Sequence, residues 1–105
     1  MEISPQDSYV LADGTRLPAI GFGTYRLNGS KGVQTICSAI DCGYRLIDSA
    51  FNYENEGAVG EALRRSGIDR SEILVASKLP GRHYLRTEAI ATIQESLFRM
   101  GLDYF

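Results

Sequence analysis

Short apolar segments alternate with longer amphipathic segments along most of this chain. The apolar segments begin near Ile20, Leu46, Ile73 and Leu102, at intervals of 26, 27 and 29 residues. Strands that alternate with helices at this spacing are typical of parallel β/α units. The segment 73–76 is apolar at every position, as expected for a parallel strand that is covered on both faces. The pattern therefore predicts an α/β fold.

The amphipathic segments each carry one apolar face with the period of a helix. In the first, Val33, Ile36, Cys37 and Ile40 follow the spacing i, i+3, i+4, i+7. Each predicted helix is followed by a glycine, which can adopt the left-handed conformation that stops a helix. The remaining apolar faces are Val59, Ala62 and Leu63, then Ile90, Ile93, Leu97 and Met100, and the three glycines are Gly43, Gly67 and Gly101.

A β-hairpin over Val10–Leu17 is predicted ahead of these units. Asp13-Gly14 is a favoured pair for a tight two-residue turn, because both turn positions need a positive φ. Pro18 has no amide hydrogen to donate, so we expect it to end the pairing of the two strands.

Polar residues gather where the predicted strands end. Gly23 and Thr24 follow the first strand, Asp48 ends the second and Lys78 ends the third. Neighbouring strands lie ~4.8 Å apart, so Asp48 and Lys78 are within pairing range if both point to the same face. The two-residue alternation of strands places both on the inner face. A rim salt bridge without a catalytic role is the alternative interpretation.

Tyr53 follows Asp48 by five residues, at the approach to the second helix. A free phenol has a pKa near 10 and gives up its proton reluctantly at neutral pH. A lysine ammonium at ~4 Å would attract the phenolate by ~4 kcal/mol at an effective dielectric constant near 20. That attraction could lower the pKa by ~2–3 units before Asp48 offsets part of it. Tyr53 is therefore a candidate general acid, with a packed aromatic as the alternative.

The stretch from Gly43 to Gly60 reads Gly-Tyr-Arg-x-x-Asp-Ser-Ala, then five residues, then Glu-x-x-Val-Gly. This pattern resembles the signature of the aldo-keto reductase family, in particular its bacterial 2,5-diketogluconate reductase-like members, and the likeness runs from about Val10 to Phe105. It implies an NADPH-dependent carbonyl reductase on a (β/α)₈ TIM barrel. Residues 1–105 would then hold the hairpin, three β/α units and the start of strand four, with no second domain. Because such a barrel takes ~250 residues, we expect the chain to be incomplete.

The resemblance also implies a role for each candidate residue. Tyr53 is the general acid, Lys78 perturbs it, and Asp48 is the partner of Lys78. The residues that hold the adenosine 2′-phosphate come late in the family's barrel, beyond this sequence. Residues implied to contact the nicotinamide end of NADPH (NADP⁺) are Gly23, Thr24, Tyr25 and Asp48.

Two other features suggest chemistry less clearly. The family's catalytic histidine stands at the end of strand four, whereas the only histidine here, His83, lies one strand too early. We therefore expect His83 to be a solvated loop residue, or a residue that lines a pocket. Gly21-Phe22-Gly23 resembles a phosphate-binding turn, but Arg26 replaces the third glycine of the Rossmann pattern, which argues against that fold.

Composition excludes several other classes of protein. The chain is 44% hydrophobic and 23% charged with a net charge of −2, and it has no basic run for nucleic acid or a membrane surface. Residues 1–7 lack the regions of a signal peptide, and no apolar run approaches the length of a membrane span. Cys37 and Cys42 are expected to be free thiols, which suits a reducing, cytoplasmic location. No metal site is expected.

The expected ligand is a small aldehyde or ketone. We also expect the rest of the barrel, or another copy of the chain, to be needed for a stable fold, and residues 1–105 alone to be inactive. A regulatory subunit with the same fold, such as those attached to ion channels, and a crystallin-like structural protein are the alternatives. An intact set of Asp48, Tyr53 and Lys78 favours the enzyme, since neither alternative needs a tuned phenol.

Overall fold

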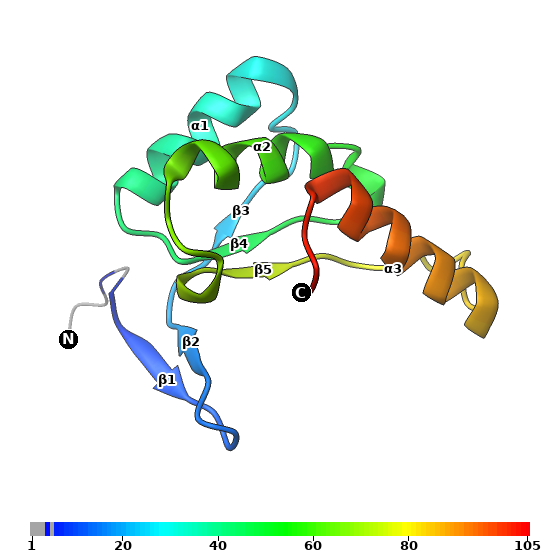
Figure 1. Cartoon of the computed structure of the whole chain (residues 1–105), viewed down its shortest axis with the longest axis horizontal. Helices are drawn as coiled ribbons and strands as arrows, with labels where there is room; N and C mark the ends of the chain where they lie inside the picture. The colour runs from blue at the N-terminus through cyan, green and yellow to red at the C-terminus, as the bar shows by residue number, and fades with distance from the viewer. Residues whose placement is uncertain (1–3, 5) are drawn as a thin grey trace.

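The computed structural model describes residue 4 and residues 6–105. A three-stranded parallel sheet in the order β3-β4-β5 forms its centre, and a separate antiparallel hairpin, β1-β2, precedes it. Figure 1 shows the helices gathered along one side of the sheet, with the hairpin projecting away from it. In chain order the elements are β1 (Ser8–Val10), β2 (Arg16–Pro18), β3 (Phe22–Gly23), α1 (Gly29–Asp41), β4 (Leu46–Asp48), a short 3₁₀ helix (Phe51–Tyr53), α2 (Glu56–Ser66), a second 3₁₀ helix (Arg70–Glu72), β5 (Leu74–Ala76) and α3 (Arg86–Met100).

The predicted apolar faces of α1 and α2 form the core with the helix-facing side of the sheet. Residues of both helices belong to one buried cluster with Ile47 of β4 and Val75 of β5, the central residues of these strands. Gly67 and Gly101 adopt the left-handed conformation at the ends of α2 and α3, and Gly43 has a φ of 109° just after α1, so the three predicted stops are confirmed. The core consists of Val33, Ile36, Ile40, Ile47, Val59, Ala62, Leu63, Ile73, Val75 and Met100.

The buried face of α3 differs from the predicted one. Ile90 and Ile93 are 43% and 40% exposed, whereas Thr92 and Ser96 are buried. His83 and Glu56, on neighbouring segments, form hydrogen bonds with these two hydroxyls. Met100, at the end of α3, is the residue of this helix that belongs to the hydrophobic core. The expectation that α3 buries a continuous apolar stripe is therefore wrong for its first two turns.

The hairpin turn is longer than predicted. The amide of Leu11 donates to the carbonyl of Thr15 at 2.8 Å, and the amide of Gly14 donates to the carbonyl of Leu11 at 2.9 Å. Of the turn residues only Gly14, with a φ of 87°, has a positive φ. This is a three-residue loop that ends in a glycine bulge, so the prediction of two positive-φ residues at Asp13 and Gly14 is wrong.

Pro18 does not end the pairing either. It lies opposite Ser8, and the amide of Ala19, one residue later, still donates to the carbonyl of Asp7 at 2.8 Å. In an antiparallel ladder every second pair exchanges no hydrogen bonds. Pro18 occupies such a position, where its missing amide hydrogen is not needed.

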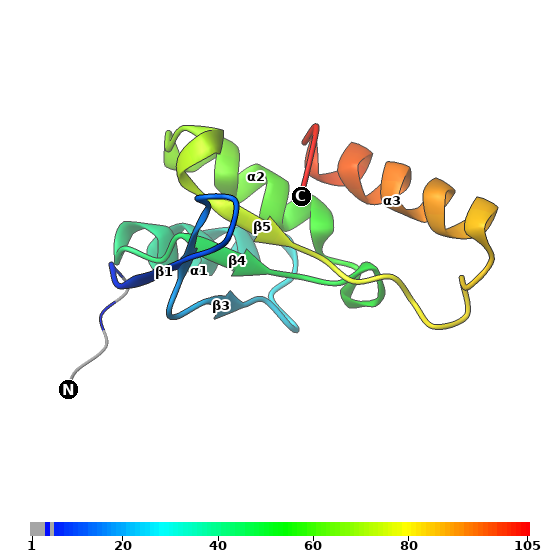
Figure 2. The same cartoon turned by 90° about the horizontal axis from the view of Figure 1, so that it is seen from below.

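The two faces of the parallel sheet have different environments. Ile47 and Val75 point to the helices and are buried, whereas Leu46, Leu74 and Ala76 lie on the other face and are only half-buried. Figure 2 shows that the described helices leave this second face uncovered. The alternation predicted for these strands is confirmed, and the open face is the one expected to line a barrel.

The last four residues do not form a strand. Residues 102–105 have turn or irregular conformation, so the strand expected to begin near Leu102 is not formed. The guanidinium of Arg70 instead holds this segment. It donates to the carbonyls of Ile73 and Tyr104, both at 2.6 Å, and lies 4.0 Å from the centre of the Tyr104 ring.

Residues 1–7, expected to lack the regions of a signal peptide, are described only in part, since residues 1–3 and 5 lie outside the described residues. Within residues 6–105, Cys37 and Cys42 are both free, as predicted. No helix in the described part is long and apolar enough to cross a membrane.

Candidate active site

The carboxyl ends of the three parallel strands meet at one edge of the sheet. Gly23 lies opposite Asp48, and Asp48 lies opposite Ala76. Strand-like hydrogen bonds continue past the strand ends, from the Thr24 amide to the Asp48 carbonyl and from the Phe51 amide to the Lys78 carbonyl, at 3.0 and 3.1 Å. The backbone therefore brings the candidate residues of three distant segments to one place.

Asp48 and Lys78 form the predicted ion pair. The Nζ of Lys78 lies 2.7 Å from Oδ2 of Asp48 and also donates to the carbonyl of Ser49 at 2.9 Å. The two side chains are 52% and 37% exposed. Partial burial of the Lys78 ammonium works to lower its pKa, but the hydrogen bond and charge of Asp48, with a smaller contribution from Tyr53, outweigh burial and raise that pKa above its ordinary value. Lys78 is thus a fixed positive charge at neutral pH.

Tyr53 lies directly beside this ion pair. It is the last residue of the 3₁₀ helix that follows β4, and its amide donates to the carbonyl of Ala50 at 3.0 Å. The centre of its ring is 5.1 Å from the Nζ of Lys78 and 5.1 Å from the ring of Tyr25, which meets it edge-on. The structure therefore brings together all three residues that the sequence predicted to act in catalysis.

The candidate cofactor residues line the same edge but present different groups to it. A side chain added at Gly23 would lie in open space, and Tyr25 as a residue is 62% exposed. Thr24 is fully buried, and its hydroxyl donates to the Asp48 carbonyl at 2.9 Å. Its amide donates to the same carbonyl and its own carbonyl accepts from Asn55, so Thr24 exposes neither side chain nor backbone at this edge.

Arg26 has an unusual backbone conformation beside these residues. Its φ of 66° is in the left-handed region, which a residue with a side chain occupies rarely. Its guanidinium lies 5.3 Å from the centre of the Tyr25 ring. A flat ring with an amide substituent could bind at this edge, against the aromatic faces, the carboxylate of Asp48 and Gly23, which has no side chain.

No group of three metal-ligating side chains occurs among the described residues.

A buried polar network lies behind the ion pair, and sequence reasoning missed it. Asn55 accepts a hydrogen bond from the Ser49 hydroxyl at 2.8 Å. Its amide group donates to the carbonyl and hydroxyl of Thr24, at 2.5 and 3.2 Å, and to the carbonyl of Leu27 at 3.2 Å. Alternation could have indicated it, because Ser49 continues the helix-facing side of Ile47 and so places a polar group where burial is expected.

Glu56 forms a second buried polar cluster, between β5, α2 and α3. Its carboxylate accepts from the hydroxyl of Ser77 at 2.6 Å and from that of Ser96 at 2.9 Å, with the guanidinium of Arg99 3.8 Å away. The side chain lies in the first turn of α2, where the helix dipole favours a negative charge. Glu56 therefore ties the residue before Lys78 to both α2 and α3.

His83 is not the solvated residue that we expected. It is half-buried, its Nδ1 lies 2.8 Å from the hydroxyl of Thr92, and its ring meets that of Phe51 edge-on at 5.6 Å. These contacts fasten the loop after β5 to α3 and to the 3₁₀ helix that carries Tyr53. The hydroxyl of Thr92 donates to the carbonyl of Glu88 at 2.8 Å, and its oxygen remains able to accept from the ring of His83.

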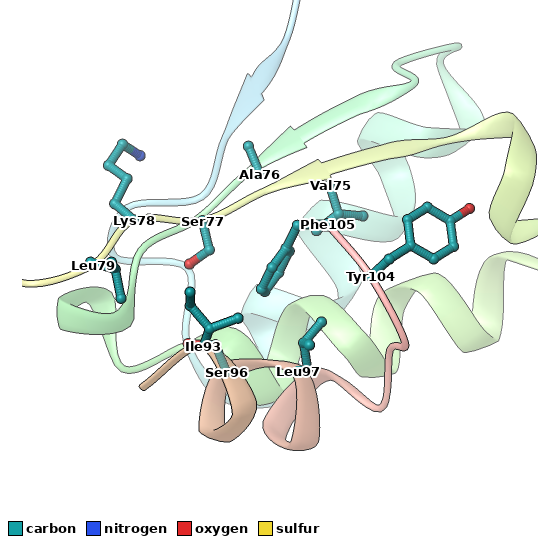
Figure 3. A pocket seen from close by; sticks show the side chains of 10 residues that line it. All are labelled: Val75, Ala76, Ser77, Lys78, Leu79, Ile93, Ser96, Leu97, Tyr104 and Phe105. Atoms are coloured by element: carbon teal, nitrogen blue, oxygen red, sulfur yellow. The ribbon is translucent and has the colours of Figure 1, made fainter. Parts of the chain in front are cut away.

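An apolar groove of about 660 Å³ runs between β5 and α3, on the side away from the ion pair. Figure 3 shows Lys78 pointing away from the groove, whereas Ser77 points towards α3. The groove follows the open edge of β5 and so has room for further chain beside that strand. It is lined by Val75, Ala76, Ser77, Lys78, Leu79, Ile93, Ser96, Leu97, Tyr104 and Phe105.

Comparison of the sequence with known proteins gives a consistent result. The model of the aldo/keto reductase family matches residues 19–105. The 2,5-diketo-D-gluconic acid reductase B of Corynebacterium sp. is 54% identical over 93 residues, which are 89% of this chain and 34% of that protein. Morphine 6-dehydrogenase of Pseudomonas putida is 45% identical over 94 residues, or 90% of this chain and 32% of that protein. The chain thus spans about a third of the length of these relatives.

Solved structures agree with this match. An aldo/keto reductase from Brucella melitensis superposes with a TM-score of 0.87 at 33% identity, over 93% of this chain and 38% of that protein. The aldo-keto reductase of Bombyx mori, solved in complex with NADP, gives a TM-score of 0.84 at 32% identity, over 94% and 36%. These similarities confirm the predicted fold class, an N-terminal part of a (β/α)₈ barrel preceded by a hairpin. The chain belongs to the aldo/keto reductase family.

Proposed function

We propose that this chain is the catalytic N-terminal part of an enzyme that reduces an aldehyde or ketone to an alcohol with NADPH, with Tyr53 as the general acid. One observation carries the proposal. The Asp48–Lys78 pair, with the Tyr53 ring 5.1 Å from the ammonium, lies at the carboxyl ends of parallel strands. Barrel enzymes place their active sites at this face.

The three side chains have complementary parts in the proposed reaction. Tyr53 donates a proton to the carbonyl oxygen, which leaves a phenolate that must be stabilised. The Nζ of Lys78 lies 5.1 Å from the centre of the Tyr53 ring. A phenolate oxygen ~4–5 Å from this ammonium would be attracted by ~3–4 kcal/mol at an effective dielectric constant of ~20. Because Lys78 is half-exposed, solvent reduces that attraction. The negative charge of Asp48 offsets a further part of this attraction, but its 2.7 Å contact with Nζ keeps the ammonium in place.

The open edge beside Tyr53 suits the nicotinamide end of the cofactor. Gly23 offers no side chain to obstruct a ring, Tyr25 offers an exposed aromatic face, and Asp48 offers a carboxylate that can accept from an amide. Thr24, which is buried, would support this edge through its hydrogen bonds with Asp48 and Asn55. NADPH would supply the hydride, while these residues orient the ring and exclude water from one side.

The names of the relatives support carbonyl and alcohol chemistry, since one is a diketo acid reductase and another a morphine dehydrogenase. Each extends well beyond the region that matches this chain. We therefore propose that the remaining barrel, or another copy of the chain, completes the site and the sheet, and that residues 1–105 alone are inactive. The family's catalytic histidine would come from that remainder. The free thiols Cys37 and Cys42 support a cytoplasmic location.

A chimeric barrel, in which residues 1–105 replace the matching third of the Corynebacterium reductase, tests the proposal. With NADPH and a simple aldehyde, Tyr53→Phe should lower kcat by ~10²–10⁴, the usual range for losing a general acid. NADPH affinity should change little, because the phenol acts on the carbonyl. Tyr44→Phe is the matched control, since it also removes a phenol hydroxyl. Its ring packs on Phe22, and Tyr44 precedes β4, at the opposite end of that strand from Asp48. Wild-type turnover in Tyr53→Phe would remove Tyr53 from the mechanism. A chimera that binds NADPH without turnover would favour a regulatory role.

A further inference from the structure

We propose that Asn55 is a positioning residue for the general acid: its buried side chain fixes Tyr53 relative to Asp48 and Lys78 and joins their loop to the one that carries Tyr25. This inference rests on the proposed function, because it assigns a role to Asn55 only through Tyr53. Asn55 itself lies behind the ion pair and is 3% exposed, so it is not offered as a catalytic residue.

Both the oxygen and the NH₂ group of the Asn55 side chain are hydrogen-bonded, and their partners lie on two different loops. Asn55 accepts from Ser49, whose carbonyl in turn accepts from the Lys78 ammonium. It donates to Thr24 and Leu27, which flank Tyr25. The hydroxyl of Thr24 completes this hydrogen-bond network by donating to the carbonyl of Asp48. Through these bonds the loop after β3, the end of β4 and the ammonium of Lys78 share one buried junction.

Because its side chain is used in this junction, Asn55 does not cap the helix that begins after it. It is the N-cap residue of α2, where an asparagine usually accepts a hydrogen bond from the first turn of the helix, yet its side chain makes no capping bond. The preceding residue, Glu54, has a φ of 56°, a left-handed conformation that costs about 1 kcal/mol or more. An asparagine at this position favours a relaxed, capped helix start, so the buried link from Asn55 to the other loop helps to hold the observed turn, together with the exposed bond from Asn28 to the carbonyl of Glu54.

The turn held by Asn55 begins at Tyr53, only two residues earlier. Proton transfer depends on a reach of roughly 3 Å between donor and acceptor, and a displacement of ~1 Å can reduce a rate by ~10². The 3₁₀ helix is also held at its first residue, since the amide of Phe51 donates to the carbonyl of Lys78 and its ring meets that of His83, but Tyr53 is the residue next to the turn. Its ring contacts Tyr25 and Lys78, and both of these also depend on the Asn55 junction.

Double-mutant kinetics on the chimeric barrel distinguish positioning from a general effect on folding. Asn55→Ala should lower kcat by ~10², but should lower it less than about threefold further in the Tyr53→Phe background, because the group that it positions is already gone. The basic limb of the pH–rate profile should also move in Asn55→Ala alone. The control is Asn28→Ala, which removes an exposed asparagine that joins the same two segments through the carbonyl of Glu54, 3.3 Å away. It should keep kcat within about twofold.

The possible outcomes separate this inference from the proposed function. Multiplicative losses for Asn55→Ala and Tyr53→Phe would overturn the positioning role, whereas a fully active Tyr53→Phe would overturn the function itself. If Asn55→Ala does not fold, Asn55→Asp takes its place in both backgrounds. An aspartate has the same shape, suits an N-cap and still accepts from Ser49, but it cannot donate to Thr24 or Leu27. The same non-additive loss is expected, and wild-type turnover in Asn55→Asp would refute the role of the junction.

Discussion

Gly60 is expected to tolerate no side chain, because α2 and α3 touch backbone to backbone at this residue. A Cβ built on Gly60 would lie 2.2 Å from the carbonyl oxygen of Met100 and 2.7 Å from its carbonyl carbon. Ordinary contacts of this kind are longer than 3 Å. The neighbouring atoms belong to backbone rather than to the end of a flexible side chain, so Gly60→Ala must move α3 by ~1 Å in a close-packed interior.

The expected loss in free energy of unfolding is the balance of two opposing contributions. Overpacking a core costs ~1–3 kcal/mol, and the rigid Met100 carbonyl, which also accepts from Arg64 at 2.9 Å, puts this case at the upper end. The higher helix propensity of alanine returns ~0.5–1 kcal/mol. The free energy of unfolding of the chimeric barrel should therefore fall by ~2 kcal/mol. With a urea m value of ~2–3 kcal/mol per M, the midpoint of unfolding should fall by roughly 1 M.

Gly57→Ala is the matched control for this prediction. It is one turn earlier in α2, and the nearest atom to its added Cβ is the carbonyl oxygen of Arg99 at 4.0 Å. Urea unfolding followed by circular dichroism should show an unchanged or slightly higher midpoint for this variant. A Gly60→Ala midpoint at or above that of Gly57→Ala would refute the argument. A displaced α3 should also weaken the hydrogen bond from Ser96 to Glu56, so turnover should fall with stability.

Three further outcomes are expected. Lys78→Met should slow turnover and shift the basic limb of the pH–rate profile upward, because the phenolate loses the charge that stabilises it; a slower enzyme with an unmoved profile would make Lys78 purely structural. The raised pKa of Lys78 means that its pair with Asp48 contributes stability, ~1 kcal/mol at most, at neutral pH, and that this contribution is lost only as the pH rises above about 10.5. The difference in unfolding free energy between wild type and Lys78→Met should therefore show no trend from pH 6 to 9, and a steady fall over this interval would contradict the assignment. Residues 1–105 alone should associate and should not oxidise NADPH, since the uncovered sheet face and the groove beside β5 are apolar, and adding the complementary C-terminal piece should restore some activity; a monodisperse, cooperatively unfolding monomer would contradict this.

The sequence alone determined the β/α order, the helix stops and the place of the ion pair. These features depend on short-range rules, such as the apolar period of α1, the left-handed glycines and the alternation that puts Asp48 and Lys78 on one face. The signature from Gly43 to Gly60 also indicated the family, and the role of each site residue followed from that resemblance. The geometry that brings Asp48, Lys78 and Tyr53 together agrees with it, and their roles stay predictions.

Only the tertiary structure decided which polar residues are buried and why. Asn55 and Glu56 read as ordinary residues at a helix start, and their partners Thr24, Ser77 and Ser96 are up to 40 residues away in the sequence. The same holds for Gly60, whose missing side chain matters only because Met100 comes to lie against it. Local propensity cannot encode such contacts, because the free energy of a buried polar or close-packed group depends on what the rest of the fold places beside it.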